Sequence, residues 1–68
     1  MPSTVVAHIS YDEAARELHV SFTGGEIYTY YDVPKPVHAA FRAAASKGRF
    51  FNAHIKDRYD FRRHARSA

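Results

Sequence analysis

The 68-residue chain is predicted to form a small α+β domain, in which a three-stranded antiparallel β-meander is followed by two short helices packed on one face (β-β-β-α-α). Three observations predict this order. Apolar and polar residues alternate in three short segments of the first half, as in half-buried strands. Gly24-Gly25 separates two of these segments and suits a tight hairpin. After Pro34 and Pro36 the apolar spacing becomes that of an amphipathic helix.

The predicted strands cover residues 5–11, 17–23 and 26–31, with a polar connection over residues 12–16. In a strand, every second side chain lies on the same face. The residues expected on the buried face of the first two strands are Val5, Ala7, Ile9, Tyr11, Leu18, Val20 and Phe22. The third strand is expected to end before Pro34, because proline cannot donate to a ladder.

The first predicted helix begins near Val37, and its apolar residues recur at the spacing of one helix face. They are Val37, Ala40, Phe41, Ala44 and Ala45. Ser46 and Gly48 interrupt this pattern, and a second short helix is predicted over residues 49–56. Tyr59 and Phe61 are expected to fold back and place two rings on the core.

Length and composition limit the chain to one domain. A chain of this size buries only about 60% of the surface that its unfolded form exposes. Five Phe, five Tyr and a 46% apolar content are typical of a folded chain, and no cysteine is present for disulfides or thiolate zinc sites. The predicted domain covers residues 4–62, followed by a basic, frayed tail over residues 63–68. No long apolar run or signal-peptide pattern occurs, which predicts a cytoplasmic protein without a membrane partner.

The position of Tyr28 and Tyr30 depends on the length of the hairpin loop. A two-residue loop pairs Ser21 with Tyr28, so that both rings form an exposed platform of the kind that stacks nucleic-acid bases. A three-residue loop with Gly25 in the left-handed region pairs Val20 with Tyr28, so that both rings join the core. Burial is favoured, because each ring would bury roughly 150–250 Å² at about 25 cal/mol per Å². The exposed platform remains the alternative.

Basic residues are concentrated in the last third of the chain. Residues 1–45 carry a net charge of −2 and residues 46–68 a net charge of +5. Arg49, Asn52 and Lys56 share one face of the second predicted helix, and aligned cations can bridge successive phosphates. The predicted nucleic-acid contacts are Lys47, Arg49, Asn52, Lys56, Arg58, Arg62 and Arg63, with Tyr28 and Tyr30 as stacking residues. The alternative is a solvated basic surface without a partner.

Several short motifs occur in a fixed order along the chain. They are Ile9–Asp12, Leu18–Phe22, Tyr28–Tyr30, Asp32–Pro34 and Ser46–Asn52, followed by Ile55 and Tyr59. In this order and spacing the sequence resembles the KTSC domain, a module named after the C-terminal end of some lysyl-tRNA synthetases that also occurs alone in small bacterial and phage proteins. The family often has a Tyr where this chain has Phe50 and Phe51, which keeps the ring and removes a hydroxyl donor. Attachment to a tRNA-charging enzyme implies RNA binding by association.

These observations predict a non-catalytic nucleic-acid-binding module with RNA as its partner. The alternative is a protein-interaction or self-association module, homodimer included, that uses the outer face of the sheet. That face is expected to present Val6, His8, His19, Ile27 and Tyr31. Catalysis is not expected, because no pattern supplies a nucleophile together with an orienting group and oxyanion donors. The five histidines lack the close spacing of a zinc helix, so neither a metal nor another cofactor is predicted.

Overall fold

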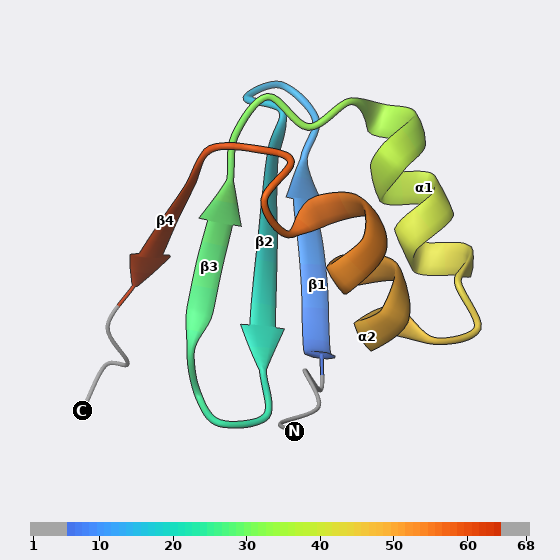
Figure 1. The fold of residues 1–68 in the computed structure, drawn as a ribbon. Coiled ribbons are helices and arrows are strands. Elements are labelled where there is room, and N and C mark those ends of the chain that lie inside the picture. The colour runs from blue at the N-terminus through green and yellow to red at the C-terminus, as the bar shows by residue number, and fades with distance from the viewer. Residues whose placement is uncertain (1–5, 65–68) are drawn as a thin grey trace.

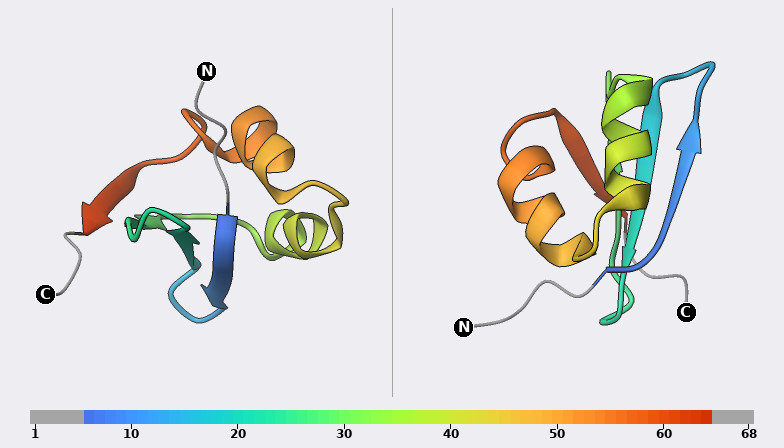
Figure 2. Two further views of the ribbon diagram at one scale, coloured as in Figure 1. Left: turned by 90° about the horizontal axis from the view of Figure 1, so that it is seen from below. Right: turned by 90° about the vertical axis from the view of Figure 1, so that its right-hand side faces the viewer.

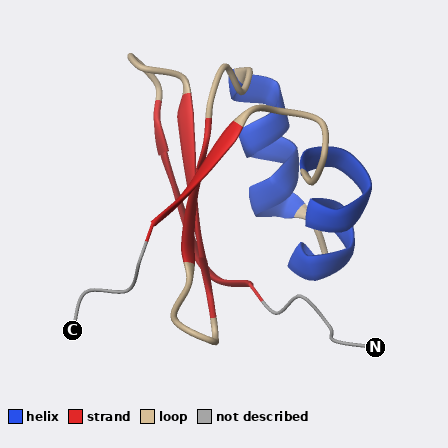
Figure 3. Cartoon of the chain, turned by 60° about the vertical axis from the view of Figure 1, so that its left-hand side comes forward, coloured by secondary structure: helices blue, strands red, loops and turns tan. Residues whose placement is uncertain are grey.

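The computed structural model describes residues 6–64, which form one four-stranded antiparallel sheet with helices on one of its faces (Figures 1, 2 and 3). The sheet order is β1-β2-β3-β4, with β1 (Val6–Asp12), β2 (Glu17–Phe22), β3 (Ile27–Tyr30) and β4 (Phe61–His64). The helical elements are α1 (Lys35–Ala43), α2 (Lys47–Phe50) and the π-helical turn η1 (Phe51–Ile55), which continues α2. Within residues 6–64 the helices are too short and too polar to span a bilayer. The predicted α+β class is confirmed.

The fourth strand was not predicted. Phe61 pairs with Tyr30 and Arg63 with Tyr28 across β3 and β4, although residues 63 and 64 were expected in a tail. All four residues of β4 are exposed, and its sequence lacks the apolar alternation that marks a buried strand. Adjacent arginines are typical of an edge strand, where charge discourages pairing with other chains. Residues 65–68 of the predicted tail, Arg66 among them, lie outside the described residues, as does Val5.

The hairpin between β2 and β3 has the three-residue loop. Phe22 N–H donates to the Glu26 carbonyl oxygen, and Gly25 N–H donates to the Phe22 carbonyl oxygen, each at 2.9 Å. Gly25 has φ 96°, which side-chain-bearing residues rarely adopt. The resulting register pairs Val20 with Tyr28 on the helix-covered face. The prediction that the tyrosines face the core is therefore confirmed, and the exposed platform on the outer face is not formed.

A register shift in β1 changes which side chains at its start face the core. Val6 pairs with Phe22, whereas His8 pairs with Ser21, so the register shifts by one residue at Ala7. As a result Val6 packs against the core and Ala7 is exposed, the opposite of what the sequence predicted. Ile9 lies inward as expected.

The helices begin and end at recognisable signals. Pro34 is the residue before α1, and Phe41 is its fully buried residue. The helix ends at Ala43, so the predicted apolar stripe is shorter than expected, and Ala40 and Ala45 are exposed. Ser46 caps α2, accepting a hydrogen bond from the Arg49 N–H at 3.3 Å. The second helix therefore begins two residues earlier than predicted.

The core lies between the sheet and the helices. Its buried apolar residues are Leu18, Val20, Tyr30, Val33, Phe41, Phe51 and Ile55. The Tyr11 hydroxyl donates to the Val33 carbonyl oxygen at 2.6 Å, so this partly buried ring satisfies its polar group at the core boundary. Tyr59 packs against the core as expected, whereas Phe61, which was also expected there, lies on the edge strand and is 52% exposed. The core thus fixes the position of α2, η1 and β4, which carry the predicted basic contacts.

Candidate nucleic-acid interface

Four of the predicted contacts lie on α2, on η1 or directly after it. Arg49, Asn52 and Lys56 are exposed. Lys47 is half-buried, and its Nζ donates to the Ala44 carbonyl oxygen at 2.6 Å. Ala44 directly follows α1, and carbonyl groups at a helix end have no partner within the helix. The Lys47 ammonium group supplies the hydrogen bond that water would otherwise supply to this carbonyl. Lys47 therefore has a structural partner that competes with a phosphate.

The π-helical turn breaks the predicted alignment of the helix cations. Lys56 N–H donates to the Phe51 carbonyl oxygen at 2.9 Å, the i→i+5 pattern of a π turn. A π turn contains more residues than an α turn, so it displaces the side chains that follow it around the helix axis. Lys56 also has ψ 130° and leaves the helix. Regular α-helical spacing, which placed Lys56 above Arg49, is therefore not maintained.

The two arginines of β4 lie on opposite faces of the sheet. Arg63 is paired with Tyr28 on the helix-covered face, and Arg62 is paired with Thr29 on the outer face. Arg63 Nη2 lies 3.2 Å from Glu26 Oε2, and both side chains are largely exposed. An exposed ion pair of this kind is weak, so Arg63 can exchange Glu26 for another anion.

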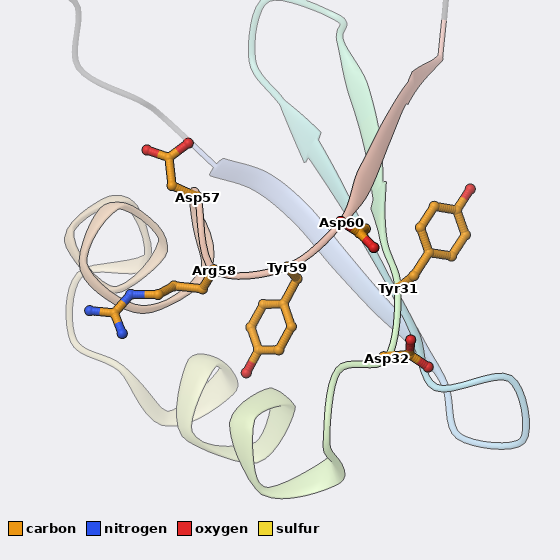
Figure 4. Close-up of a pocket in the computed structure, with 6 residues that line it drawn as sticks. All are labelled: Tyr31, Asp32, Asp57, Arg58, Tyr59 and Asp60. Carbon is orange, nitrogen blue, oxygen red and sulfur yellow. The ribbon is translucent and has the colours of Figure 1, made fainter.

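Arg58 borders a hollow that three aspartates also line. It lines a hollow of about 350 Å³ together with Tyr31, Asp32, Asp57, Tyr59 and Asp60. Figure 4 shows that these side chains point in different directions, with Tyr31 directed away from Arg58 and Tyr59. The Arg58 guanidinium is directed away from Asp32 and Asp60 in Figure 4, and the polar groups share no common point. The seven predicted polar contacts therefore do not form one continuous basic surface.

An aromatic surface along β4, at one end of the strand order, was not predicted from the sequence. The Phe61 ring lies 5.6 Å from the Tyr28 ring and 5.5 Å from the Tyr30 ring, and Phe61 is 52% exposed. Tyr28 is half-buried, and Arg63 lies opposite it on the same face. We refer to Tyr28, Phe61 and Arg63 as the β4 ledge. The adjacent arginines after Phe61 were the available signal for an edge strand.

Tyr30 belongs to the core and not to a stacking surface. It is 3% exposed, and its ring packs between those of Phe51 and Phe61, with centroid distances of 5.6 and 5.5 Å. Burial raises the pKa of the Tyr30 hydroxyl well above its ordinary value of 10.0, and nearby Tyr28 and Asp57 act in the same direction. Tyr30 is therefore a neutral core residue at physiological pH, and its predicted contact with a base is not compatible with its burial.

The outer face of the sheet is mostly polar. His19 Nδ1 and His64 Nε2 lie 2.9 and 2.8 Å from the Thr29 hydroxyl oxygen, and the imidazoles leave Thr29 only 4% exposed. Ile27 is 38% exposed on this face, whereas Val6, which was expected there, packs on the other side. The apolar outer patch proposed for self-association is therefore smaller than predicted.

Metal-binding groups do not gather in the described part of the chain. Within residues 6–64 no cluster of three or more His, Asp or Glu side chains has the geometry to hold a metal ion. His38 stacks on Tyr11 at a centroid distance of 4.7 Å, and His54 lies 4.6 Å from the Phe50 ring. Burial lowers the pKa of His38 below 6.5, and Arg42 adds to this effect. His38 thus packs against a ring of β1, and His54 against a ring of α2.

Comparison with known proteins identifies the family. The family model of the KTSC domain matches residues 2–59. The chain belongs to the KTSC domain family. A crystal structure of a KTSC domain protein from Yersinia pestis superimposes with a TM-score of 0.87 at 35% sequence identity, covering 96% of this chain and 92% of that one. The resemblance inferred from the motifs is thereby confirmed.

Two protein sequences show this KTSC domain in different settings. A protein of Tsukamurella paurometabola is 42% identical over 57 residues, which cover 84% of this chain and 85% of that protein. A lysine–tRNA ligase of Nostoc punctiforme is 34% identical over 58 residues, which cover 85% of this chain and 10% of that enzyme. The domain therefore occurs as most of a small protein and as a short segment of a much larger one.

Proposed function

We propose that this KTSC domain is a non-catalytic RNA-binding module. The observation that carries the proposal is the 34% identity to a segment of a lysine–tRNA ligase. An enzyme that joins lysine to tRNA has an RNA substrate, and an added domain with a basic surface would increase its hold on that substrate. The domain of this chain would bind RNA in the same way.

Two separate groups of side chains support this proposal. Arg49, Asn52 and Lys56 are exposed on or beside the second helical segment, where they can contact phosphate oxygens. The β4 ledge adds an exposed ring, and a base stacked on an aromatic side chain contributes about 1–3 kcal/mol. Arg63 lies on the same face as that ring and can contact the adjacent phosphate.

A binding role fits the chemistry of the surface better than catalysis does. The Thr29 hydroxyl between two imidazoles is the arrangement that most resembles an activated nucleophile. Thr29 is only 4% exposed, so a substrate could not reach its hydroxyl without displacing His19 or His64. The proposal therefore includes no chemical step and no cofactor.

The test is a fluorescence-anisotropy titration with tRNA and a single-stranded RNA at two salt concentrations. The double substitution Arg49→Glu with Lys56→Glu should weaken binding at least tenfold at low salt. Each lost phosphate contact should reduce the slope of log K against log salt by about 0.7 for a single strand.

The matched control is Lys35→Glu with Arg42→Glu, which changes the net charge equally on α1, where both residues are exposed. This control should weaken binding by less than threefold, because Lys35 and Arg42 are not among the proposed contacts and exposed charges are screened within about 10 Å at 0.1 M salt. Absence of binding at low salt would overturn the proposal. An equal loss in both double variants would show nonspecific attraction and would overturn the proposed contacts.

A further inference from the structure

A groove between the two helical segments carries an inference beyond general RNA binding. It has a volume of about 560 Å³, within the range of about 300–1,000 Å³ typical of small-molecule sites. Its lining residues come from α1, from α2 and η1, and from the segment that leads to β4. They are Pro36, Val37, Ala40, Phe50, His54, Arg58 and Tyr59.

The walls of the groove differ in chemistry. One wall consists of the small apolar residues of α1, and Ala40 is exposed there because no large side chain covers it. The other wall is aromatic: Phe50 and His54 lie 4.6 Å apart, and Tyr59 points toward α1 in Figure 4. A flat, uncharged ring would contact apolar atoms on one side and aromatic rings on the other.

The charge of the groove selects for an anionic group beside that ring. Arg58 is the charged residue of the lining, whereas the carboxylates of Asp32, Asp57 and Asp60 line a second hollow that Arg58 also borders. A guanidinium can bind two phosphate oxygens in its plane, which makes arginine well suited to a phosphate.

The backbone next to the groove is irregular in a way that recurs at functional sites. The π turn of η1 begins directly after Phe50 and contains His54. Single π turns within helices are found frequently at binding and catalytic sites. Here the turn keeps the His54 ring next to the Phe50 ring, while Phe50 also stacks on buried Phe41 at 5.3 Å and is held in place.

From these features we infer that the groove binds one unpaired nucleotide of an RNA, with the base between α1 and the aromatic wall and a phosphate at Arg58. This inference rests on the proposed function and specifies its ligand: single-stranded RNA, because a paired base is not free to enter. The groove should bind a nucleoside monophosphate weakly and a single-stranded RNA more tightly.

The test fills the groove without disturbing the core. Ala40→Leu places a larger side chain in the groove on an exposed helical position, and Ala39→Leu adds the same side chain at an exposed neighbour that does not line it. Leucine is a good helix former, so neither variant should unfold α1. A ten-nucleotide single-stranded RNA should bind Ala40→Leu about tenfold more weakly than the unmodified protein, and Ala39→Leu within twofold of it.

A second readout identifies the ligand. Addition of 5′-AMP should shift the backbone amide resonances of Ala40 and His54, and Arg58→Gln should reduce the response to 5′-AMP more than the response to adenosine. If RNA binds but Ala40→Leu binds it normally, the groove is not the base site and the proposed function stands. If single-stranded and duplex RNA both fail to bind the unmodified protein, the proposed function itself fails. Shifts at the groove caused by an apolar peptide and not by 5′-AMP would also overturn the inference.

Discussion

The two faces of the sheet are built from alternating residues of the same strands, yet they have opposite chemistry. The helix-covered face of β2 and β3 presents Leu18, Val20 and Tyr30, all buried beneath the helices. The outer face presents His19 and Thr29, which hydrogen-bond to each other at 2.9 Å. A two-residue hairpin loop would move Tyr28 and Tyr30 to the outer face, so the loop length determines which side chains of β3 join the core. The two faces therefore differ because the helices cover one of them, in addition to the difference between their residues.

The largest expected effect on stability comes from a substitution on the helix-covered face. Leu18→Ala should lower the free energy of unfolding by about 2–5 kcal/mol, because Leu18 is fully buried and the substitution leaves a cavity. Ile27→Ala on the outer face of β3 should cost less than about 1 kcal/mol, since Ile27 is 38% exposed. Urea unfolding measures both values. If Leu18→Ala does not fold, Leu18→Val should give a smaller, measurable loss in the same direction. Equal losses for the two alanine variants would contradict the proposed asymmetry.

The next effect concerns the loop that sets the register. Gly25→Ala should destabilise the domain by roughly 1–2 kcal/mol, because Gly25 has φ 96° and an L-residue is strained there. Gly24→Ala is the matched control: an added Cβ would meet no atom within 4 Å, so the change should lie within about 0.5 kcal/mol of zero. Thermal unfolding of the two variants gives the comparison. A Gly25→Ala protein as stable as the Gly24→Ala protein would show that the loop tolerates another conformation.

The hydrogen bonds on the outer face offer an effect of similar size. Thr29→Val keeps the shape of the side chain and removes the hydroxyl that joins His19 to His64, which should cost about 1–2 kcal/mol for the lost hydrogen bonds. Thr29→Ser retains the hydroxyl and should preserve the bonds. Chemical denaturation, with imidazole resonances recorded by NMR, tests both. If Thr29→Val leaves the His64 resonances unchanged, the bridge between β3 and β4 does not exist in solution.

The features that were predictable from the sequence are those set by local chemistry. Gly24-Gly25 marks the hairpin, Pro34 and Pro36 mark the start of α1, and Ser46 marks the cap of α2. The preference for buried tyrosines followed from the area that their rings could bury, and the register agrees. The basic face of the second helix was also predictable as exposed, and Arg49 is exposed.

The features that were not predictable depend on tertiary contacts. A π turn has no local signal in residues 51–55, where Phe51 and Ile55 are both drawn into the core, and it displaces Lys56. The strand β4 lacks alternation because neither of its faces is fully covered. The shift at Ala7 is visible only once β1 is paired with β2. Side chains that were neighbours in a regular helix or tail therefore separate in the folded domain, which explains why the predicted basic stripe divides.

The smallest expected effect concerns the titration of Tyr30 on the covered face. Its folded-state pKa lies above its unfolded value near 10, so the neutral form is favoured by folding and stability is lost as the pH rises above 10. At pH 10.5 the unfolded state has largely lost this proton. If the folded state keeps it, the free energy of unfolding is about 0.8 kcal/mol lower than at neutral pH. Tyr30→Phe should flatten the fall in stability between pH 9 and 10.5, whatever its effect on stability at neutral pH. The Tyr30 hydroxyl is buried on the helix-covered face of the sheet. If Tyr30→Phe leaves the pH dependence of stability unchanged, water reaches the Tyr30 hydroxyl in the folded protein. The helix-covered face would then be open to solvent next to β4.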